Sequence, residues 1–395
     1  MEPRFADRVA QMDASDIRQL MKIITDSSLI SFGAGNPAKN LFPIEELKKA
    51  NDLVYRDNAL EAFQYSNSEG YAPLREWIAD RHNTANQTHF VKDNILITNG
   101  SQQGLDLVGK ILLNKGDIVL CESPTYTSAL SAFRSYECEF RDVTMDSEGM
   151  ILSEVEALIT KHNNIKLIYI IPNYQNPTGT TWSLERRKAI AEIAAKNRII
   201  IIEDDPYNEM GFDGSRIPSI SKFDNNKIVI TLGSFSKSLC PGLRIGWIIA
   251  SEDILAKLIY AKQATDLQTN EIVQRQVYYY LKMYNFDEHL SGMREKYKHR
   301  CKIACDSATA FFPETVHFIK PAGGFFLWLS LPDHIDTKDL LPLAIQRGVA
   351  YVPGQSFYSD KSRHNNIRLN YSSAAEPDLV RGIQILGSLF NEVCS

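Results

Sequence analysis

The sequence contains no long apolar run. No stretch approaches the roughly 20 apolar residues that a membrane-spanning helix requires, so we expect no membrane segment. The first residues, MEPRFADRVAQMDASDIRQLMKI, carry charges throughout and lack the apolar centre of a secretory signal. The sequence therefore predicts a protein that is neither membrane-embedded nor secreted.

Runs of a single charge sign are also missing. The net charge is −5, and a chain without a basic face is not expected to bind nucleic acid. The six cysteines are scattered, which indicates reduced thiols in the cytoplasm and not a disulfide framework. Cys301 and Cys305 lie four residues apart with His299 nearby, but a metal site would need more ligands, so no metal is expected.

Internal repeats, low-complexity tracts and obvious linkers are absent as well. What remains is an ordinary globular composition of 395 residues, 44% hydrophobic and 23% charged. A chain of this length is expected to form two or three domains, or one large α/β domain with a smaller partner.

Short apolar runs alternate with amphipathic stretches through the middle of the chain. Six runs predict buried strands: 94–99, 117–122, 166–171, 198–204, 227–232 and 244–250. Residues 101–114 and 183–197 have helical spacing, and Ser183 can cap the second of these helices. This alternation predicts a mostly parallel sheet with helices on both faces.

The pattern changes after residue 250. Helical spacing extends over 251–312 and is followed by short strands at 323–331, 349–354 and 365–372 and a helix at 377–390. We therefore expect a large domain over residues 46–285 and a smaller α+β domain built from residues 1–45 and 286–395. In this arrangement the N-terminal segment packs on the C-terminal one.

Polar residues follow several of the predicted strands, where ligands bind in open α/β sheets. After NILIT, the turn NGSQQG places Ser101 and Gln102 in the first turn of a helix, which can bind a phosphate, although many ordinary turns look alike. After DIVLCE comes Tyr126, which can stack on a flat ring or simply pack in the core.

Two further strand ends carry groups that suit a pyridine ring. Asn176 lies in the turn NPTG and can donate a hydrogen bond to an anionic ring oxygen. The acids of EDDPY are costly to bury without a partner. They either mark an exit into solvent or pair one carboxylate with a buried cation, such as a protonated pyridine nitrogen.

The stretch SFSKSLCPGLRIGW, residues 234–247, follows another buried strand. It is either a surface loop with two ordinary cations or a site. A partly desolvated Lys237 near other cations has a lowered pKa and can form a Schiff base. Ser234, Ser236 and Arg244 can hold a phosphate dianion. Together with the other strand ends, these groups indicate pyridoxal phosphate as the cofactor.

These residues resemble the motifs of a known family. S-F-S-K followed by P-G-L-R-x-G, with NPTG and D-x-x-Y upstream, is similar to the fold-type-I, class I/II pyridoxal-phosphate aminotransferases. The chain looks closest to α-aminoadipate and kynurenine aminotransferases and to the catalytic half of MocR-type regulators. The resemblance extends from residues 31–37 to residues 365–372. It implies a large domain built on a mostly parallel sheet of seven strands flanked by helices, together with a smaller α+β domain.

The resemblance also implies roles for the residues at the strand ends. Lys237 would form the Schiff base with the cofactor and move the proton during the reaction. Asp204 would pair with the pyridine nitrogen, although Asp205 is an alternative that strand periodicity does not exclude. Tyr207 and Asn176 would both contact the phenolic oxygen of the ring.

Further roles follow from the same resemblance. Tyr126 would stack on the ring, and the phosphate would be surrounded by Ser101, Gln102, Ser234, Ser236 and Arg244. Tyr65 resembles a tyrosine that reaches the phosphate in the partner subunit, which implies a homodimer with shared sites. Arg368 matches the arginine that binds the substrate carboxylate, and Gly35 and Asn36 would lie beside the substrate.

The implied activity is ping-pong transamination between an L-amino acid and a 2-oxo acid. The acceptor would be 2-oxoglutarate and the donor an aromatic, branched-chain or 2-aminoadipate-like amino acid, with residues near Ile17 to Leu20 contributing to the substrate pocket. The same scaffold supports β-lyases, decarboxylases and cyclopropane-forming synthases. A non-catalytic regulator domain is a further alternative, although little sequence precedes residue 31 for a DNA-binding domain.

Overall fold

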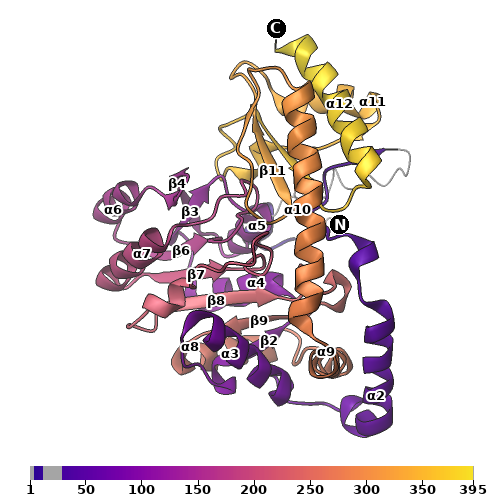
Figure 1. The fold of residues 1–395 in the computed structure, drawn as a ribbon. Helices are drawn as coiled ribbons and strands as arrows, with labels where there is room; N and C mark the ends of the chain where they lie inside the picture. The colour runs from indigo at the N-terminus through magenta and orange to yellow at the C-terminus, as the bar shows by residue number, and fades with distance from the viewer. Residues whose placement is uncertain (1–3, 12–28, 395) are drawn as a thin grey trace.

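The computed structural model describes residues 4–11 and 29–394, and an eight-stranded sheet forms its centre (Figure 1). The strand order is β2-β9-β8-β7-β6-β3-β4-β5. In that order the strands span Ile95–Thr98, Gly246–Ile249, Val229–Ser234, Ile200–Asp204, Ile165–Ile170, Ile118–Ser123, Glu139–Asp146 and Gly149–Met150.

Most of this sheet is parallel, as predicted. The strands β8, β7, β6, β3 and β4 pair in parallel, whereas β9 is antiparallel to its neighbours β2 and β8. The eighth strand, β5, is a two-residue addition that pairs antiparallel with β4, beside the seven strands expected. Parallel strands bring their carboxyl ends to one edge, where ligands bind in such sheets.

The six predicted strands all form, with small shifts at their ends, because their apolar side chains are covered on both faces. One strand, β4, is not among the predicted ones. Its sequence EFRDVTMD is largely polar, and most of its residues are exposed or half-buried near the sheet edge. An edge strand that is half solvated lacks the continuous apolar run by which a buried strand is found in a sequence.

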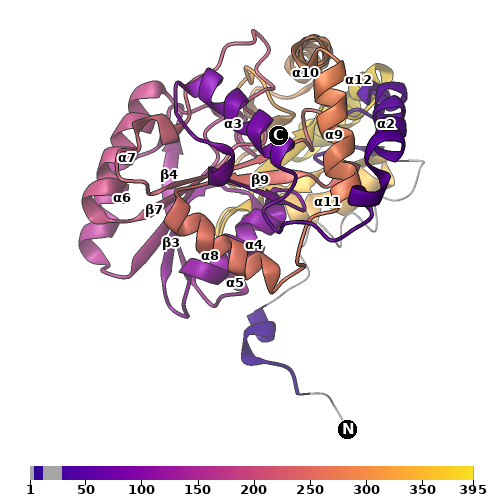
Figure 2. The same ribbon diagram turned by 90° about the horizontal axis from the view of Figure 1, so that it is seen from below.

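Helices cover both faces of the sheet, which Figure 2 shows from below. One face packs on α4 (Ser101–Leu112), α5 (Thr127–Arg134) and α8 (Glu252–Gln263). The other face packs on α6 (Leu152–Lys161), α7 (Leu184–Asn197) and α3 (Ala72–Asn86). The predicted cap of α7 forms, since the Arg186 backbone N–H donates to Ser183 Oγ at 3.2 Å.

The C-terminal part of the chain builds a second, smaller sheet. Its order is β10-β11-β14-β13, and the strands span His317–Phe318, Phe326–Ser330, Asn366–Asn370 and Val352–Pro353. The helices α10 (Phe286–Phe311), α11 (Thr337–Gln346) and α12 (Glu376–Val393) accompany it. In Figure 1 the long helix α10 runs from beside the large sheet to the C-terminal end of the molecule.

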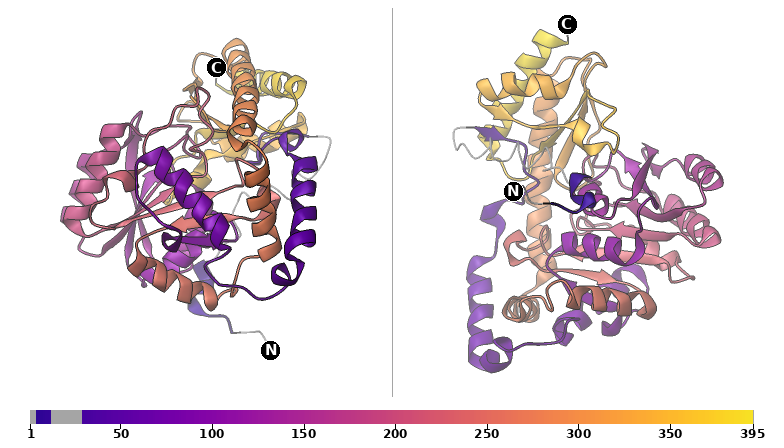
Figure 3. Two further views of the ribbon diagram at one scale, coloured as in Figure 1. Left: turned by 60° about the horizontal axis from the view of Figure 1, so that its bottom comes forward. Right: turned by 180° about the vertical axis from the view of Figure 1, so that it is seen from behind.

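The N-terminal residues join this smaller sheet region. β1 (Ile30–Ser31) pairs in parallel with β12 (Val349–Ala350), and Phe32 is buried among side chains of the C-terminal part. Next along the chain, α2 (Ile44–Ala62) packs against α9 (Glu271–Met283), and Figure 3 shows the two helices side by side. A division into residues 46–285 against 1–45 and 286–395 remains our proposal.

The described ranges also bear on membrane association. Within residues 4–11 and 29–394, no helix combines the length and the apolar character that crossing a bilayer requires. All six cysteines carry free thiols.

Candidate active site

A cavity lies at the carboxyl edge of the large sheet. Its volume of about 310 Å³ is at the lower end of the range for small-molecule sites, roughly 300 to 1,000 Å³. Thirteen of the fourteen predicted site residues line it: Gly35, Asn36, Ser101, Gln102, Tyr126, Asn176, Asp204, Tyr207, Ser234, Ser236, Lys237, Arg244 and Arg368. Tyr65 is not among the lining residues and is 79% exposed.

Lys237 follows β8 and extends into this cavity. Its Nζ donates a hydrogen bond to the Gly35 carbonyl at 2.7 Å and lies 5.8 Å from the centre of the Tyr207 ring. Burial, together with the charges of Arg368 and Arg244, lowers the pKa of Lys237 to about 8. A lysine with a lowered pKa supplies a neutral amine, which is the form that attacks a carbonyl carbon.

The two aspartates at the end of β7 face opposite sides of the sheet. Asp204 lines the cavity, and its Oδ2 accepts from the Tyr169 hydroxyl at 2.8 Å. Its Oδ1 is buried and accepts from no residue that the structure describes. Burial raises the pKa of Asp204 to about 6. Asp205 instead accepts from Asn173 Nδ2 at 2.8 Å on the rear side, so only Asp204 faces the cavity.

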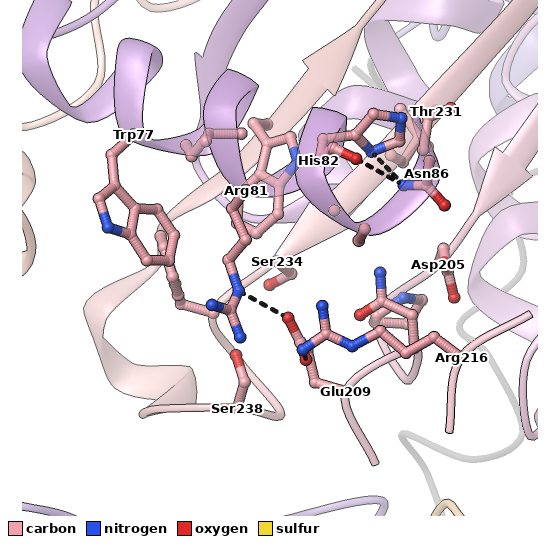
Figure 4. Close-up of a pocket in the computed structure, with 18 of the residues that line it drawn as sticks. Trp77, Arg81, His82, Asn86, Asp205, Glu209, Arg216, Thr231, Ser234 and Ser238 are labelled. Atoms are coloured by element: carbon pink, nitrogen blue, oxygen red, sulfur yellow. Dashed lines mark hydrogen bonds and ion pairs between the residues drawn. The ribbon is translucent and has the colours of Figure 1, made fainter. Parts of the chain in front are cut away.

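Asp205 lies in the wall of a second, smaller cavity, the rear cavity (Figure 4). Its volume is about 50 Å³, and polar lining residues include His82, Asn86 and Thr231. At its mouth, Arg81 Nε donates to Glu209 Oε1 at 2.8 Å. Burial and the neighbouring Glu203 raise the pKa of Asp205 to about 7. Asp205, the alternative partner for a ring nitrogen, therefore lines the rear cavity and not the cavity that contains Lys237.

Arg368, in β14, lines the same cavity. Its Nη1 donates to Asn176 Oδ1 at 2.8 Å and its Nη2 to the Gly33 carbonyl at 2.6 Å. The guanidinium carbon lies 4.4 Å from the centre of the Phe326 ring and 5.0 Å from that of Phe357. Its Nε is buried and donates to no described residue. A buried, oriented guanidinium with a spare donor suits a carboxylate.

The part of the cavity at the start of α4, here called its α4 end, is rich in hydroxyl and N–H groups. Ser101 begins α4 after Gly100, whose φ of 77° favours glycine, and a side chain there would collide with Arg244. Ser234 Oγ donates to Ser236 Oγ at 2.8 Å. Arg244 Nη2 donates to the Asn99 carbonyl at 3.0 Å, yet the residue is exposed overall. Free N–H groups of a helix start, hydroxyls and a guanidinium suit a phosphate.

Two tyrosines form the remaining polar walls. Burial raises the pKa of Tyr126, and burial likewise raises the pKa of Tyr207 above its usual range, so both phenols are neutral donors. Neither carries a charge that would compete with Asp204 for a cation. The aromatic ring of Tyr126 and the hydroxyl of Tyr207 therefore remain for a flat, oxygen-bearing ligand.

Sequence reasoning missed some contributors to this site. Tyr169 orients Asp204 through its hydroxyl, but within KLIYII it reads as one more apolar strand residue. Ser128, whose backbone carbonyl accepts from Gln102 Nε2 at 3.0 Å, also lines the cavity. The alternation of a strand does place Tyr169 on one face, but the sequence does not give the register. In the structure Tyr169 pairs with Ile202, and Asp204 lies two residues further on the same face, within reach of the hydroxyl.

The side chains fit pyridoxal phosphate. The phosphate suits the α4 end, and the unpaired Oδ1 of Asp204 suits a protonated ring nitrogen. Lys237 offers an amine that suits the aldehyde, and the spare donor of Arg368 suits a substrate carboxylate. A lysine after a strand of a mostly parallel sheet, facing such groups, defines a pyridoxal-phosphate enzyme of fold type I.

Comparison with known families agrees. The family model described as aminotransferase class I and II matches residues 27–384, and the chain belongs to this family. It is a pyridoxal-phosphate-dependent aminotransferase, which exchanges the amino group between an L-amino acid and a 2-oxo acid.

Relatives and solved structures cover almost the whole chain. An aromatic-amino-acid aminotransferase of Thermococcus litoralis is 39% identical over 99% of this chain and 95% of its own length. The kynurenine aminotransferase of Pyrococcus horikoshii, solved with pyridoxamine phosphate, has a TM-score of 0.95 at 37% identity and covers 99% and 98% of the two chains.

A third similar protein is solved with a compound that joins the cofactor to an amino acid. It is the α-aminoadipate aminotransferase LysN of Thermus thermophilus, solved with N-(5′-phosphopyridoxyl)-L-leucine. Its TM-score is 0.91 at 35% identity, with 98% of this chain and 97% of that chain covered. The mostly parallel fold-type-I architecture is therefore confirmed.

Proposed function

We propose that this enzyme transfers the amino group of an aromatic, branched-chain or 2-aminoadipate-like L-amino acid to 2-oxoglutarate. The names of similar proteins support this range, because they include aromatic-amino-acid, kynurenine and 2-aminoadipate aminotransferases. The leucine adduct held by the Thermus thermophilus enzyme supports the branched-chain part. All are neutral or acidic donors whose α-carboxylate suits Arg368.

One observation carries the proposal. Lys237, Asp204 and Arg368 come from three distant parts of the chain and face one cavity. This arrangement supports Lys237 as the amine, Asp204 as the carboxylate for a ring nitrogen and Arg368 as the clamp for a substrate carboxylate. When bound, pyridoxal phosphate supplies an electron-withdrawing ring that makes the substrate α-proton removable.

The chain's own residues then orient the substrate and move protons. The guanidinium of Arg368, fixed by Asn176 and Gly33, binds the α-carboxylate and so aims the Cα–H at Lys237. The neutral amine of Lys237 takes that proton and later returns it to another carbon. The carboxylate of Asp204 holds a proton on the ring nitrogen, and Tyr207 with Asn176 donates to the ring oxygen.

The remaining assignments concern the cofactor. Tyr126 stacks on its ring, and its phosphate is held by the groups at the α4 end of the cavity: Ser101, Gln102, Ser234, Ser236 and Arg244. Gly35 and Asn36 lie beside the substrate. The expected contribution of Ile17 to Leu20 to specificity concerns residues outside the described part of the chain.

We also propose a homodimer in which Tyr65 reaches the phosphate of the partner's site. Two observations support it. Tyr65 and its neighbours Leu60 and Phe63, at the end of α2, are 79%, 87% and 63% exposed. Such a group of exposed large side chains is typical of a surface that another protein covers. Arg244, at the phosphate end of the cavity, is also exposed. A cytoplasmic location, suggested by free and scattered cysteines, is part of the same proposal.

A half-reaction tests the chemistry and the donor together. The cofactor-loaded enzyme is mixed with each of a panel of L-amino acids in the absence of any oxo acid. We expect one equivalent of the matching 2-oxo acid per site, with full turnover only after 2-oxoglutarate is added, because the reaction is ping-pong. Release of ammonia or carbon dioxide would contradict transamination, and turnover only with other oxo acids would contradict the acceptor.

A further inference from the structure

Glu122 is a buried carboxyl group that the proposed mechanism does not use. It lies in β3, is fully buried and does not line the active-site cavity. Both of its oxygens accept hydrogen bonds: Oε1 from Trp182 Nε1 at 2.8 Å, and Oε2 from Gln175 Nε2 at 3.0 Å and the Ile171 backbone N–H at 3.1 Å. A buried carboxyl group needs such partners, but their origin is informative.

All three donors belong to one segment, residues 171–182, which links β6 to α7 and contains the NPTG turn. Ile171 stands at its beginning, Trp182 at its end and Gln175 immediately before Asn176. One carboxyl group therefore joins the start, the middle and the end of the segment that carries Asn176.

Gln175 passes this restraint to the turn itself. Its Oε1 accepts from the Thr178 backbone N–H at 3.0 Å and from Thr178 Oγ1 at 2.8 Å. Its backbone carbonyl accepts from the Gly179 N–H at 2.7 Å. Its Nε2 also donates to the Pro124 carbonyl at 2.7 Å, two residues before Tyr126. The turn is thus fixed from inside by a side chain that Glu122 holds.

This series of contacts ends at Arg368, the residue proposed to bind the substrate carboxylate. Asn176, next to Gln175, accepts from Arg368 Nη1 through its Oδ1 at 2.8 Å. A shift of the turn would move that oxygen and release one of the two Nη contacts that orient the guanidinium. Small displacements of orienting groups have large kinetic effects because they spoil the alignment of the substrate.

We propose that Glu122 is a positioning residue that holds the 171–182 segment so that Asn176 orients Arg368 for the substrate carboxylate. This inference rests on the proposed role of Arg368. Glu122 does not line the cavity and acts through its contacts with Ile171, Gln175 and Trp182.

The chemistry of the position explains why a carboxyl group is needed. Each oxygen of Glu122 accepts at least one N–H, and a carboxyl group can do this on both oxygens. Burial raises the pKa of Glu122, whereas the hydrogen bonds from Gln175 and Trp182 oppose that rise and favour the ionised carboxylate, which is the form that accepts on both oxygens. A glutamine has a single accepting oxygen, so Glu122→Gln leaves at least one buried N–H facing an amide nitrogen.

The first test is the kinetics of Glu122→Gln in the cofactor-loaded enzyme. We expect KM to rise roughly tenfold for both amino acid and oxo acid, the scale of one buried hydrogen bond, while kcat falls much less. Binding of an unreactive carboxylate, 3-phenylpropionate or 4-methylpentanoate, should weaken by the same factor when followed by the cofactor absorbance. Cofactor content should stay at that of the parent enzyme.

A rescue variant separates positioning from general destabilisation. In Glu122→Gln with Trp182→Phe, the amide nitrogen no longer faces an indole N–H, and the amide oxygen can serve Gln175 and Ile171. We expect this double variant to recover most of the KM lost in the single variant, a clear departure from additivity. Absence of recovery, with a raised KM in both variants, would overturn the inference.

A matched control uses a buried carboxylate elsewhere. Glu203 also accepts from three residues, Ser219, Ile220 and Thr231. These contacts lie on the face of β7 opposite to Asp204 and the active-site cavity. Glu203→Gln should lower the melting temperature and leave both KM values near those of the parent. An equal rise of KM in Glu203→Gln would overturn the inference, because a loss of stability would then explain the effect at Glu122.

Thr178→Val covers the case in which Glu122→Gln does not fold. It removes the hydroxyl that donates to Gln175 Oε1 and that also accepts from the Thr180 backbone N–H at 3.2 Å within the same turn. On this half-buried residue the change should raise both KM values about threefold. An unchanged KM would overturn the inference. Arg368→Lys distinguishes the two levels of the argument: if it leaves KM unchanged, the proposed role of Arg368 fails, whereas a raised KM there with an unchanged KM in Thr178→Val refutes only the role of Glu122.

Discussion

Buried charged side chains lie on both sides of β7, but the two sides differ in how fully the protein satisfies their hydrogen bonds. On the cavity side, Asp204 Oδ1 and Arg368 Nε are buried without a partner among the described residues. On the rear side, Arg187 donates to five acceptors, which are Pro172 O, Asn173 Oδ1, Trp182 O, Ile217 O and Pro218 O. Asp205 is likewise tied to Asn173.

The difference shows how one sheet serves two purposes. An unpaired buried polar atom costs about 1 to 3 kcal/mol, so it persists only where something else is gained. On the cavity side that gain is a ligand that completes the hydrogen bonds. On the rear side the protein completes them itself, and the charges stabilise the fold.

The largest predicted effect comes from removing the amine of Lys237 from the cavity. Lys237→Ala should lower kcat by at least about 10³-fold, because no other amine lines the cavity among the described residues to move the substrate proton. Borohydride should no longer fix the cofactor to the protein, which mass spectrometry checks. A borohydride-fixed cofactor in the variant would place the reactive lysine elsewhere.

A paired substitution tests the two sides directly. Asp204→Asn should lower kcat about 10²-fold, the scale of one preorganised electrostatic group, because an amide cannot hold a proton on the ring nitrogen. Asp205→Asn keeps an oxygen for Asn173 and should change kcat less than about threefold.

Steady-state kinetics of both variants, with cofactor absorbance across pH, provide the comparison. Equal losses in the two variants would show that the sheet does not separate the roles of the carboxylates. A larger loss in Asp205→Asn would reverse the assignment.

Replacement of the carboxylate clamp should have the next largest effect. Arg368→Lys keeps the charge but loses the planar fork, so KM for amino and oxo acids should rise roughly 30-fold, the scale of a charged hydrogen bond. Cofactor affinity, measured by titration of the apoenzyme, should stay unchanged because Arg368 donates to Asn176 and Gly33 and to none of the residues proposed to hold the phosphate. Loss of cofactor would contradict the clamp.

Much of the central sheet follows from the sequence because its strands are buried. The runs KLIYII and KIVITL are continuous and apolar, so β6 and β8 are recognisable without any neighbour. β4 is not recognisable in this way, because its residues are largely polar and it becomes a strand by pairing with β3. Its partner, not its own pattern, makes it a strand.

The site divides in the same way. Lys237 and Asn176 stand in motifs whose local sequence identifies them, and both line the cavity. Asp204 and Asp205 could not be separated by periodicity, because the deciding fact is that both faces of β7 are buried and only one is a ligand cavity. Glu122 gave no signal, since an acid at the end of a strand usually marks an exit into solvent. The roles of the lining residues, and that of Tyr65, remain proposals.

The smallest predicted effect concerns the rear cavity and pH. Asn86 Oδ1 accepts from the Ser219 N–H at 2.8 Å, which turns its amide nitrogen toward His82 Nδ1 at 3.3 Å (Figure 4). Nδ1 must therefore stay unprotonated, and Nε2 donates to Ser221 Oγ at 3.1 Å. Burial lowers the pKa of His82 to about 4. The neutral ring is thus part of the completed network on this side.

The consequence for stability has a definite sign. An unfolded histidine has a pKa near 6.5, so between about pH 6.5 and pH 4 the unfolded state binds more protons than the folded one. The contribution of His82 is therefore fully present above pH 6.5 and is lost as pH falls toward 4, by at most ~3 kcal/mol. His82→Gln, which does not titrate, should flatten the fall of the free energy of unfolding in this window, as urea denaturation at several pH values would measure. Since Asp205 is unchanged in the variant, the difference between variant and parent isolates the histidine. Identical pH slopes would show that its protonation is not coupled to folding.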